Sequence, residues 1–181
     1  NIITTTNSLV IEFYGDWTLG GTVAMNTTAG SGTLTACGRG SQTITSNGQV
    51  YYGLWDILAP GGTYTLQGDL RTNLAQVRQF TLTRGTFNAN GYNLSHGAYV
   101  IASTMTSVLM GSGTWTINRI TAATSWTMSA SAAVINSGTS TIKYANQATG
   151  TQTFAGGGAT YYILDGTVNG TTGGVTITGA N

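Results

Sequence analysis

The sequence is dominated by short stretches in which threonine alternates with a large apolar residue. Successive side chains of a β-strand point to opposite faces, so the apolar residues of such a stretch share one face and the threonines the other. No sustained 3.6-residue apolar period competes with this pattern, and we interpret the mildly helix-like window 70–80 as a loop followed by a strand. The chain is therefore expected to be all-β. The clearest stretches are 33–35, 43–45, 63–66, 80–83, 114–117, 126–128 and 175–178.

Pairs of glycine, or of glycine with asparagine or serine, separate these strands at short intervals. Glycine and asparagine tolerate the positive φ that tight turns require. Strand starts recur roughly every 8–12 residues, a rhythm typical of a sandwich, a barrel or a solenoid. Pro60 is expected in a loop before Gly61. The segment 85–97, with Asn90 and Gly91 at its centre, predicts either a hairpin or a corner of a β-helix.

A long internal repeat narrows the choice of fold. Residues 42–54 return at 152–164, where Gln-Thr, a glycine, Tyr-Tyr and a leucine keep their places. Weaker similarities extend the two copies to about residues 16–68 and 125–179, with 69–124 between them. Such self-similarity is typical of repeat architectures. We therefore predict a β-solenoid or β-helix-like fold, with a β-sandwich or jelly roll as the alternative.

The repeat also suggests how the chain is divided. We expect a β-repeat domain over residues 15–181, preceded by an N-terminal arm or docking strand at residues 1–14, which match the repeat poorly. The sequence begins without Met and stops as the second copy ends. We therefore expect a piece of a longer protein or a processed one.

Charge and cysteine content exclude several partners. Charged residues make up 6% of the chain and the net charge is +1, whereas an ordinary globular protein has about 25% charged residues. A neutral surface gives no electrostatic footprint for nucleic acid or anionic lipid, and no apolar run approaches the roughly 18 residues of a membrane span. Cys37 is the only cysteine. It cannot form an intrachain disulfide, and we interpret it as a small half-buried residue.

The repeated elements carry a family resemblance over most of the chain from about residue 15. They are residues 32–35, the two copies of the Gln-Thr and Tyr-Tyr element, and segments 62–66, 85–94, 113–116 and 153–162. Together they resemble the β-strand repeats of phage tail-fibre and virion structural proteins and of related bacterial surface adhesins. The resemblance implies a structural or adhesive role in an elongated appendage, located on a virion surface or outside the cell. It transfers no catalytic residue to this chain.

Adjacent tyrosines are the candidate ligand or interface residues. In a strand, one tyrosine of a pair points into the core and the other lies on the face, where its ring could stack on a sugar. We favour core filling for one member of each pair, and core filling also for Trp17, Trp115 and Trp126. The four candidates are Tyr51, Tyr52, Tyr161 and Tyr162.

The few ionisable residues do not form a catalytic or metal-binding pattern. Asp56 and Asp165 are expected on similar corners of different coils, which suits structural turns better than the two facing carboxylates of a glycan hydrolase. Glu12 and Asp16 lack the ordered ligand spacing of a cation site. His96, the only histidine, is interpreted as a turn or surface residue. We therefore expect no enzymatic activity, no cofactor and no metal.

The leading hypothesis is a non-enzymatic structural protein of a phage virion or appendage, such as a tail fibre or capsid decoration. Low charge and exposed strand edges favour assembly with identical subunits and with other virion proteins. The alternative is an extracellular adhesin that binds a host glycan or receptor. A glycan hydrolase and an ice-binding protein are weaker alternatives, the latter because the threonine rows are irregularly spaced.

Overall fold

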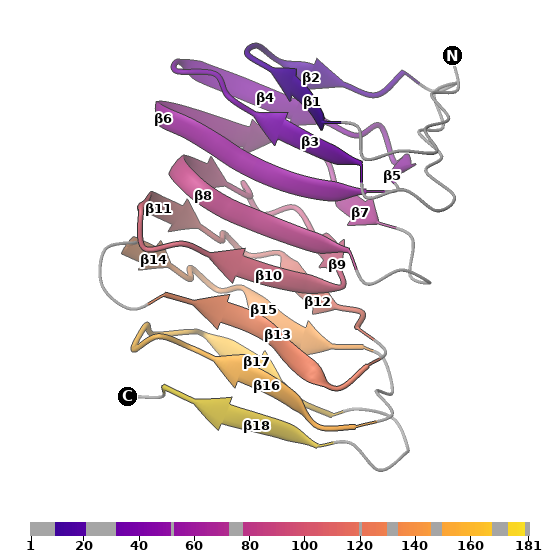
Figure 1. Cartoon of the computed structure of the whole chain (residues 1–181), viewed down its shortest axis with the longest axis vertical. Helices are drawn as coiled ribbons and strands as arrows, with labels where there is room; N and C mark the ends of the chain where they lie inside the picture. Colours follow the sequence, from indigo (N-terminus) through magenta and orange to yellow (C-terminus); the bar gives the residue numbers. More distant parts are fainter. Residues whose placement is uncertain are drawn as a thin grey trace.

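Parallel strands stacked in successive turns make up this protein. The computed structural model describes residues 10–20, 32–51, 53–72, 78–119, 121–129, 134–145, 150–167 and 174–179. Every regular element in these residues is a β-strand. The strands pair in parallel and form a 12-stranded and a 6-stranded sheet. They follow one another along the long axis from the N-terminal end, at the top of Figure 1, to the C-terminal end at the bottom. The fold is a β-solenoid of about six turns, which confirms the predicted class and excludes the sandwich alternative.

Three faces can be followed from turn to turn. Face 1 contains β1 (Val10–Phe13), β3 (Thr33–Ala36), the first part of β6 (Leu54–Leu66), the first part of β8 (Gln79–Asn88), β10 (Ala98–Ile101), β13 (Ala123–Met128), β16 (Gln152–Ala155) and β18 (Val175–Thr178). Face 2 contains β2 (Trp17–Thr18), β4 (Ser41–Thr45), the second parts of β6 and β8, β11 (Met105–Leu109) and β14 (Val134–Asn136). Face 3 contains β5 (Val50–Tyr51), β7 (Leu70–Thr72), β9 (Leu94–His96), β12 (Thr114–Ile117), β15 (Thr141–Tyr144) and β17 (Ile163–Asp165).

One inward column runs through all the turns of face 1. Each large apolar side chain of this column lies next to its counterpart in the following turn, and most are aromatic. Trp126 and Phe154, for example, stack with ring centroids 5.6 Å apart. A buried aromatic column of this kind stabilises stacking because each turn buries the apolar surface of its neighbour. The column consists of Ile11, Leu34, Trp55, Phe80, Tyr99, Trp126, Phe154 and Ile177.

The strands alternate as the sequence predicts. In β12 and β16 every second side chain is buried, and the threonines between them are half-buried on the outer surface. Trp115 and Trp126 are fully buried, and Trp17 packs against the core from a partly exposed position. The predicted core-filling role of these tryptophans is thus confirmed.

The turn at Asn90 and Gly91 is a corner and not a hairpin. It joins β8 of face 1 and face 2 to β9 of face 3, and both residues have positive φ. Corner glycines of successive turns lie on top of one another: a Cβ at Gly111 would be 2.5 Å from the nitrogen of Gly91, and a Cβ at Gly138 would be 2.3 Å from the oxygen of Gly111. Only glycine fits this column, because neighbouring turns approach through their backbones.

The expectation that Pro60 lies in a loop is wrong, since it falls within β6. The pairing of β6 with β8 is irregular between Leu58 and Thr63, and Gly61 has a φ of +73°. Proline is tolerated where a strand is bulged because no ladder hydrogen bond is required of it there. The irregularity is the bend at which β6 passes from face 1 to face 2.

The internal sequence repeat does not coincide with one turn. A turn takes between 19 residues, from Phe80 to Tyr99, and 28 residues, from Trp126 to Phe154. Gln42 pairs with Tyr64 on face 2, whereas Gln152 pairs with Ala123 on face 1. Similar stretches therefore occupy different faces. Within the expected arm, β1 pairs with β3 at the N-terminal end of face 1, and residues 1–9 lie outside the described residues.

Candidate functional site

The first tyrosine pair contributes to the core. Tyr51 is 2% exposed in β5 and meets Trp55 edge to face, with ring centroids 5.7 Å apart. Burial raises the pKa of its hydroxyl. Tyr51 is therefore core filling and cannot contact a ligand from outside. Tyr52 lies outside the described residues.

The second pair lies at the C-terminal end of the solenoid. Tyr161 is half-buried, and its hydroxyl accepts a hydrogen bond from Nε1 of Trp126 at 3.1 Å and donates one to the carbonyl oxygen of Gly156 at 3.0 Å. Burial raises the pKa of this hydroxyl, and the hydrogen bond from Trp126 opposes that shift. Tyr162 is 58% exposed. In this pair one ring packs inward and the other faces solvent, as the sequence predicts.

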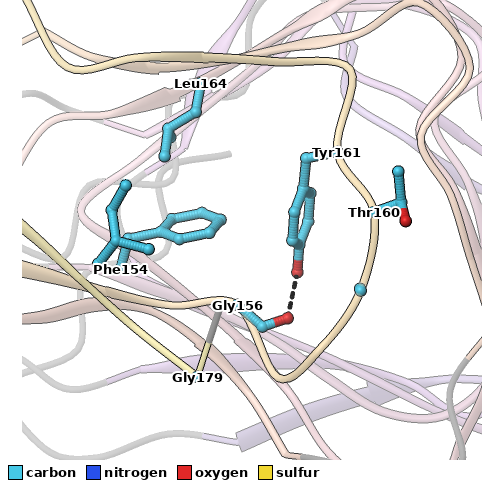
Figure 2. A pocket seen from close by; sticks show the side chains of 8 residues that line it. Phe154, Gly156, Thr160, Tyr161, Leu164 and Gly179 are labelled. Carbon is cyan, nitrogen blue, oxygen red and sulfur yellow. Dashed lines mark hydrogen bonds between the residues drawn. The ribbon is translucent and has the colours of Figure 1, made fainter. Parts of the chain in front are cut away.

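A recess opens beside Tyr161. It has a volume of about 280 Å³ and lies between the last strands of face 1 and face 3. Phe154 and Tyr161 both line the recess and contact each other edge to face, with ring centroids 5.1 Å apart and planes at 78°. Figure 2 shows the Tyr161 hydroxyl directed at Gly156, whereas the Thr160 side chain points away from the Phe154 ring. The residues lining the recess are Phe154, Gly156, Ala159, Thr160, Tyr161, Leu164, Ile177 and Gly179.

The chemistry of this recess is mainly apolar. The Tyr161 hydroxyl is already engaged by Trp126 and Gly156, so its ring offers carbon and not a free hydroxyl to an occupant. Ile177 at the rim is 53% exposed. An apolar side chain, or the carbon face of a sugar ring, matches such walls.

Two carboxylates near the N-terminal end are engaged in structural contacts. Oδ1 of Asp16 accepts hydrogen bonds from the backbone nitrogen of Thr43 at 2.6 Å and from its hydroxyl at 3.0 Å. Oε2 of Glu12 accepts one from the hydroxyl of Tyr14 at 2.8 Å. Asp16 thereby connects one turn to the next, a role that suits the observed contacts better than catalysis.

The expectation that Asp56 and Asp165 occupy similar corners is wrong. Asp56 lies in β6 on face 1, whereas Asp165 lies in β17 on face 3 opposite Lys143. Asp56 accepts a hydrogen bond from the hydroxyl of Thr83 at 2.6 Å, and Asp165 accepts one from the nitrogen of Thr167 at 3.0 Å. Burial raises the pKa of Asp56, and the hydrogen bonds from Thr167 lower the pKa of Asp165. The two carboxylates do not form a pair.

Cys37 is half-buried, as predicted. Burial raises the pKa of its thiol, and the negative charges of Glu12 and Asp56 raise it further. Thiolate is the reactive form of cysteine. The environment of Cys37 therefore suppresses reactivity, and the nearby Arg39 does not reverse this.

The interpretation of His96 as a turn or surface residue is wrong. Its side chain is fully buried in β9, with its ring 4.8 Å from that of Phe80. The alternation of Leu94, Ser95 and His96 indicates that the histidine is buried, because it places His96 on the same inward face as Leu94.

Within the described ranges, no three metal-binding side chains of the His, Cys, Asp and Glu types gather in one place. The same part of the chain contains no helix long and apolar enough to cross a membrane. Comparisons of this chain with protein-family models, with curated proteins and with solved structures give no significant match.

Proposed function

We propose that this chain is a non-enzymatic structural module of an elongated appendage, on a virion surface or outside the cell, and that it assembles with identical subunits. The sequence resemblance to phage tail-fibre and virion repeats supports this role. The solenoid supports it as well, because a rod of stacked turns sets a fixed length and offers two ends for assembly.

The observation that carries the proposal is the state of the two ends. β18 pairs only with β16 among the described strands, and β1 pairs only with β3. The apolar residues Val10 at one end and Ile177 at the other are 56% and 53% exposed. Exposed strand edges of this kind promote pairing with another chain.

The inward column supports head-to-tail pairing, in which the N-terminal end of one copy meets the C-terminal end of another. Ile11 occupies the first place of the column and Ile177 the last. A second copy placed in register against β18 would set its Ile11 where the next residue of the column belongs. Both residues are isoleucine, so the joint would repeat the apolar contacts made inside one chain.

A charge substitution at Ile177 tests this assembly. Ile177→Asp places a carboxylate in the proposed joint and should reduce the native mass, measured by light scattering, to that of one chain. Thr106→Asp is the matched control, since Thr106 is exposed in the middle strand β11 and adds the same charge. Equal masses for the wild type and both variants, at the mass of one chain, would overturn the proposal.

The recess beside Tyr161 favours a second candidate, an adhesin that binds a glycan or another surface receptor. Its aromatic lining, and the exposed Tyr162 that follows Tyr161 in the chain, offer rings on which a sugar can stack. A glycan array would test this candidate. Tyr162→Ala should abolish glycan binding that the wild type shows, and Val50→Ala in β5, far from the C-terminal end, should retain it. A wild type that binds no glycan would exclude this candidate.

A further inference from the structure

His96 lies at the centre of an aromatic cluster in the middle of the solenoid. It pairs with Ile117 of β12, and its side chain is fully buried. Its ring centroid is 4.8 Å from that of Phe80 and 5.6 Å from that of Tyr99. β9 lies about halfway between the two ends of the stack (Figure 1). Rings from β8 and β10, the strands that precede and follow β9 in two successive turns, therefore pack against the imidazole.

The surroundings offer no partner for a charged imidazole. Among the described residues, neither Nδ1 nor Nε2 of His96 has a hydrogen-bond partner. The hydroxyl of Thr72 on β7 donates to the carbonyl oxygen of Ser95 at 3.2 Å, and that of Tyr99 on β10 donates to Thr116 at 3.2 Å. Burying a charge without a partner is strongly unfavourable.

The ionisable groups of the packed elements do not offset this cost. Arg71 of β7 and Arg84 of β8 are exposed on the outer surface. The positive charge of Arg78 acts on Tyr51, where it opposes the rise in pKa that burial causes. Tyr99 on β10 is buried and neutral, because burial raises its pKa well above the ordinary value. The described parts of β7, β8, β9, β10 and β12 contain no carboxylate.

We propose that His96 is an acid-sensitive switch in the fold: uptake of one proton by its imidazole opens the turns around β9. The closed fold holds the neutral ring, and opening exposes both ring nitrogens to water, where the proton is stabilised. Opening can remain local, because solenoid turns depend mainly on their nearest neighbours. The switch is independent of the function proposed above.

The direction of the pH effect follows from linkage. Burial lowers the pKa of His96 to about 3, from an ordinary value of 6.5. Between these values the open state binds a proton that the closed state does not, so the closed state loses stability as pH falls. The open-to-closed ratio should increase about tenfold for each pH unit below 6.5, and the effect should level off near the lower value.

The pKa shifts of Asp56 and Asp165 do not account for this loss of stability in acid. Burial raises the pKa of Asp56, so its protonation in acid favours the closed state. Asp165 has a lowered pKa, which acts in the same direction as His96, but its carboxylate is exposed on β17. Solvent screening makes such a surface contribution small. Asp165→Asn provides the control for it.

Urea unfolding between pH 6 and pH 4 tests the switch. We expect the unfolding equilibrium constant of the wild type to increase about tenfold per pH unit, and His96→Leu, which approximates the volume of imidazole, to remove most of this dependence. Tyr99→Phe should retain the slope because it alters the same cluster without removing the titrating ring. Hydrogen exchange should place the first opening in β7, β9 and β12.

Nuclear magnetic resonance supplies a test that needs no variant. His96 is the only histidine, so its ring signals are unambiguous, and in the closed state they should not titrate above pH 4. Titration near pH 6.5 in the folded protein would overturn the proposal. An unchanged slope in a folded His96→Leu or His96→Gln variant would overturn it as well.

Discussion

Nε1 of Trp126 donates a hydrogen bond of 3.1 Å to the hydroxyl of Tyr161, 35 residues further along the chain. The two rings meet edge to face, with centroids 5.7 Å apart. Because the same hydroxyl donates to Gly156, it connects the indole of β13 to the corner that follows β16. This contact holds the aromatic wall of the recess against the preceding turn.

Tyr161→Phe should therefore destabilise the protein although it retains the ring. The substitution removes the hydroxyl with both of its hydrogen bonds and leaves Nε1 of Trp126 unsatisfied, at a cost of about 1–2 kcal/mol in the free energy of unfolding. Urea denaturation measures this difference. Tyr162→Phe is the control, and its exposed hydroxyl should contribute less than about 0.5 kcal/mol. Equal effects of the two variants would show that the buried hydroxyl has no special role.

Gly138→Ala should disrupt the column of corner glycines. Gly138 has a φ of +54°, and its added Cβ would lie 2.3 Å from the oxygen of Gly111. Strain and overlap together should cost about 2–4 kcal/mol. Gly48→Ala separates the two causes, since Gly48 has a φ of +72° with no atom within 4 Å of the added Cβ. It should cost only about 1 kcal/mol. Similar melting temperatures for Gly138→Ala and Gly48→Ala would contradict the close approach of the turns at Gly138.

Asn93→Ala should weaken a polar ladder across three turns of face 3. Oδ1 of Asn93 accepts a hydrogen bond from the nitrogen of Thr114 at 2.8 Å, and Nδ2 donates to Oδ2 of Asp69 at 3.2 Å. Because the ladder is exposed, we expect a loss of about 0.5–1.5 kcal/mol in chemical denaturation. Thr106→Ala on the surface of β11 should change stability by less than about 0.5 kcal/mol. A loss no larger than that of the control would mean that water replaces the ladder.

Cys37 should react slowly with iodoacetamide at neutral pH. Burial and the charges of Glu12 and Asp56 raise the pKa of its thiol, so the folded protein contains less thiolate than an unfolded chain at the same pH. The rate should increase with pH through a midpoint above 9.0, the ordinary pKa of a cysteine thiol. Glu12→Gln should lower the midpoint. A midpoint below 8 in the folded protein would contradict the described environment.

The strands could be predicted because their signal is local, whereas the solenoid class was inferred from the long internal repeat. Alternation in residues 114–117 gives the observed burial of Trp115 and Ile117 directly, and positive φ at Asn90 follows from the residue type. The register could not be predicted, since turns of 19 to 28 residues give no fixed period. The matching stretches 42–54 and 152–164 lie several turns apart and on different faces, so their similarity misleads about equivalent positions.

The site was less predictable than the fold. Tyr161 was a candidate because of its neighbour Tyr162, but the recess also needs Phe154, Leu164 and Ile177 from three separate strands. Parallel pairing brings these residues together, and no short pattern encodes it. Burial of His96 was within reach of the local pattern, because β9 alternates like the other strands.

Small-angle X-ray scattering over a wide concentration range tests the central claim most directly, since it measures particle length and cross-section together. End-to-end assembly predicts that length increases in steps of one chain while the cross-section stays constant, and that Ile177→Asp stops growth at one chain. A wild-type particle that keeps the length of one chain at every concentration, or that grows only in cross-section, would contradict the account.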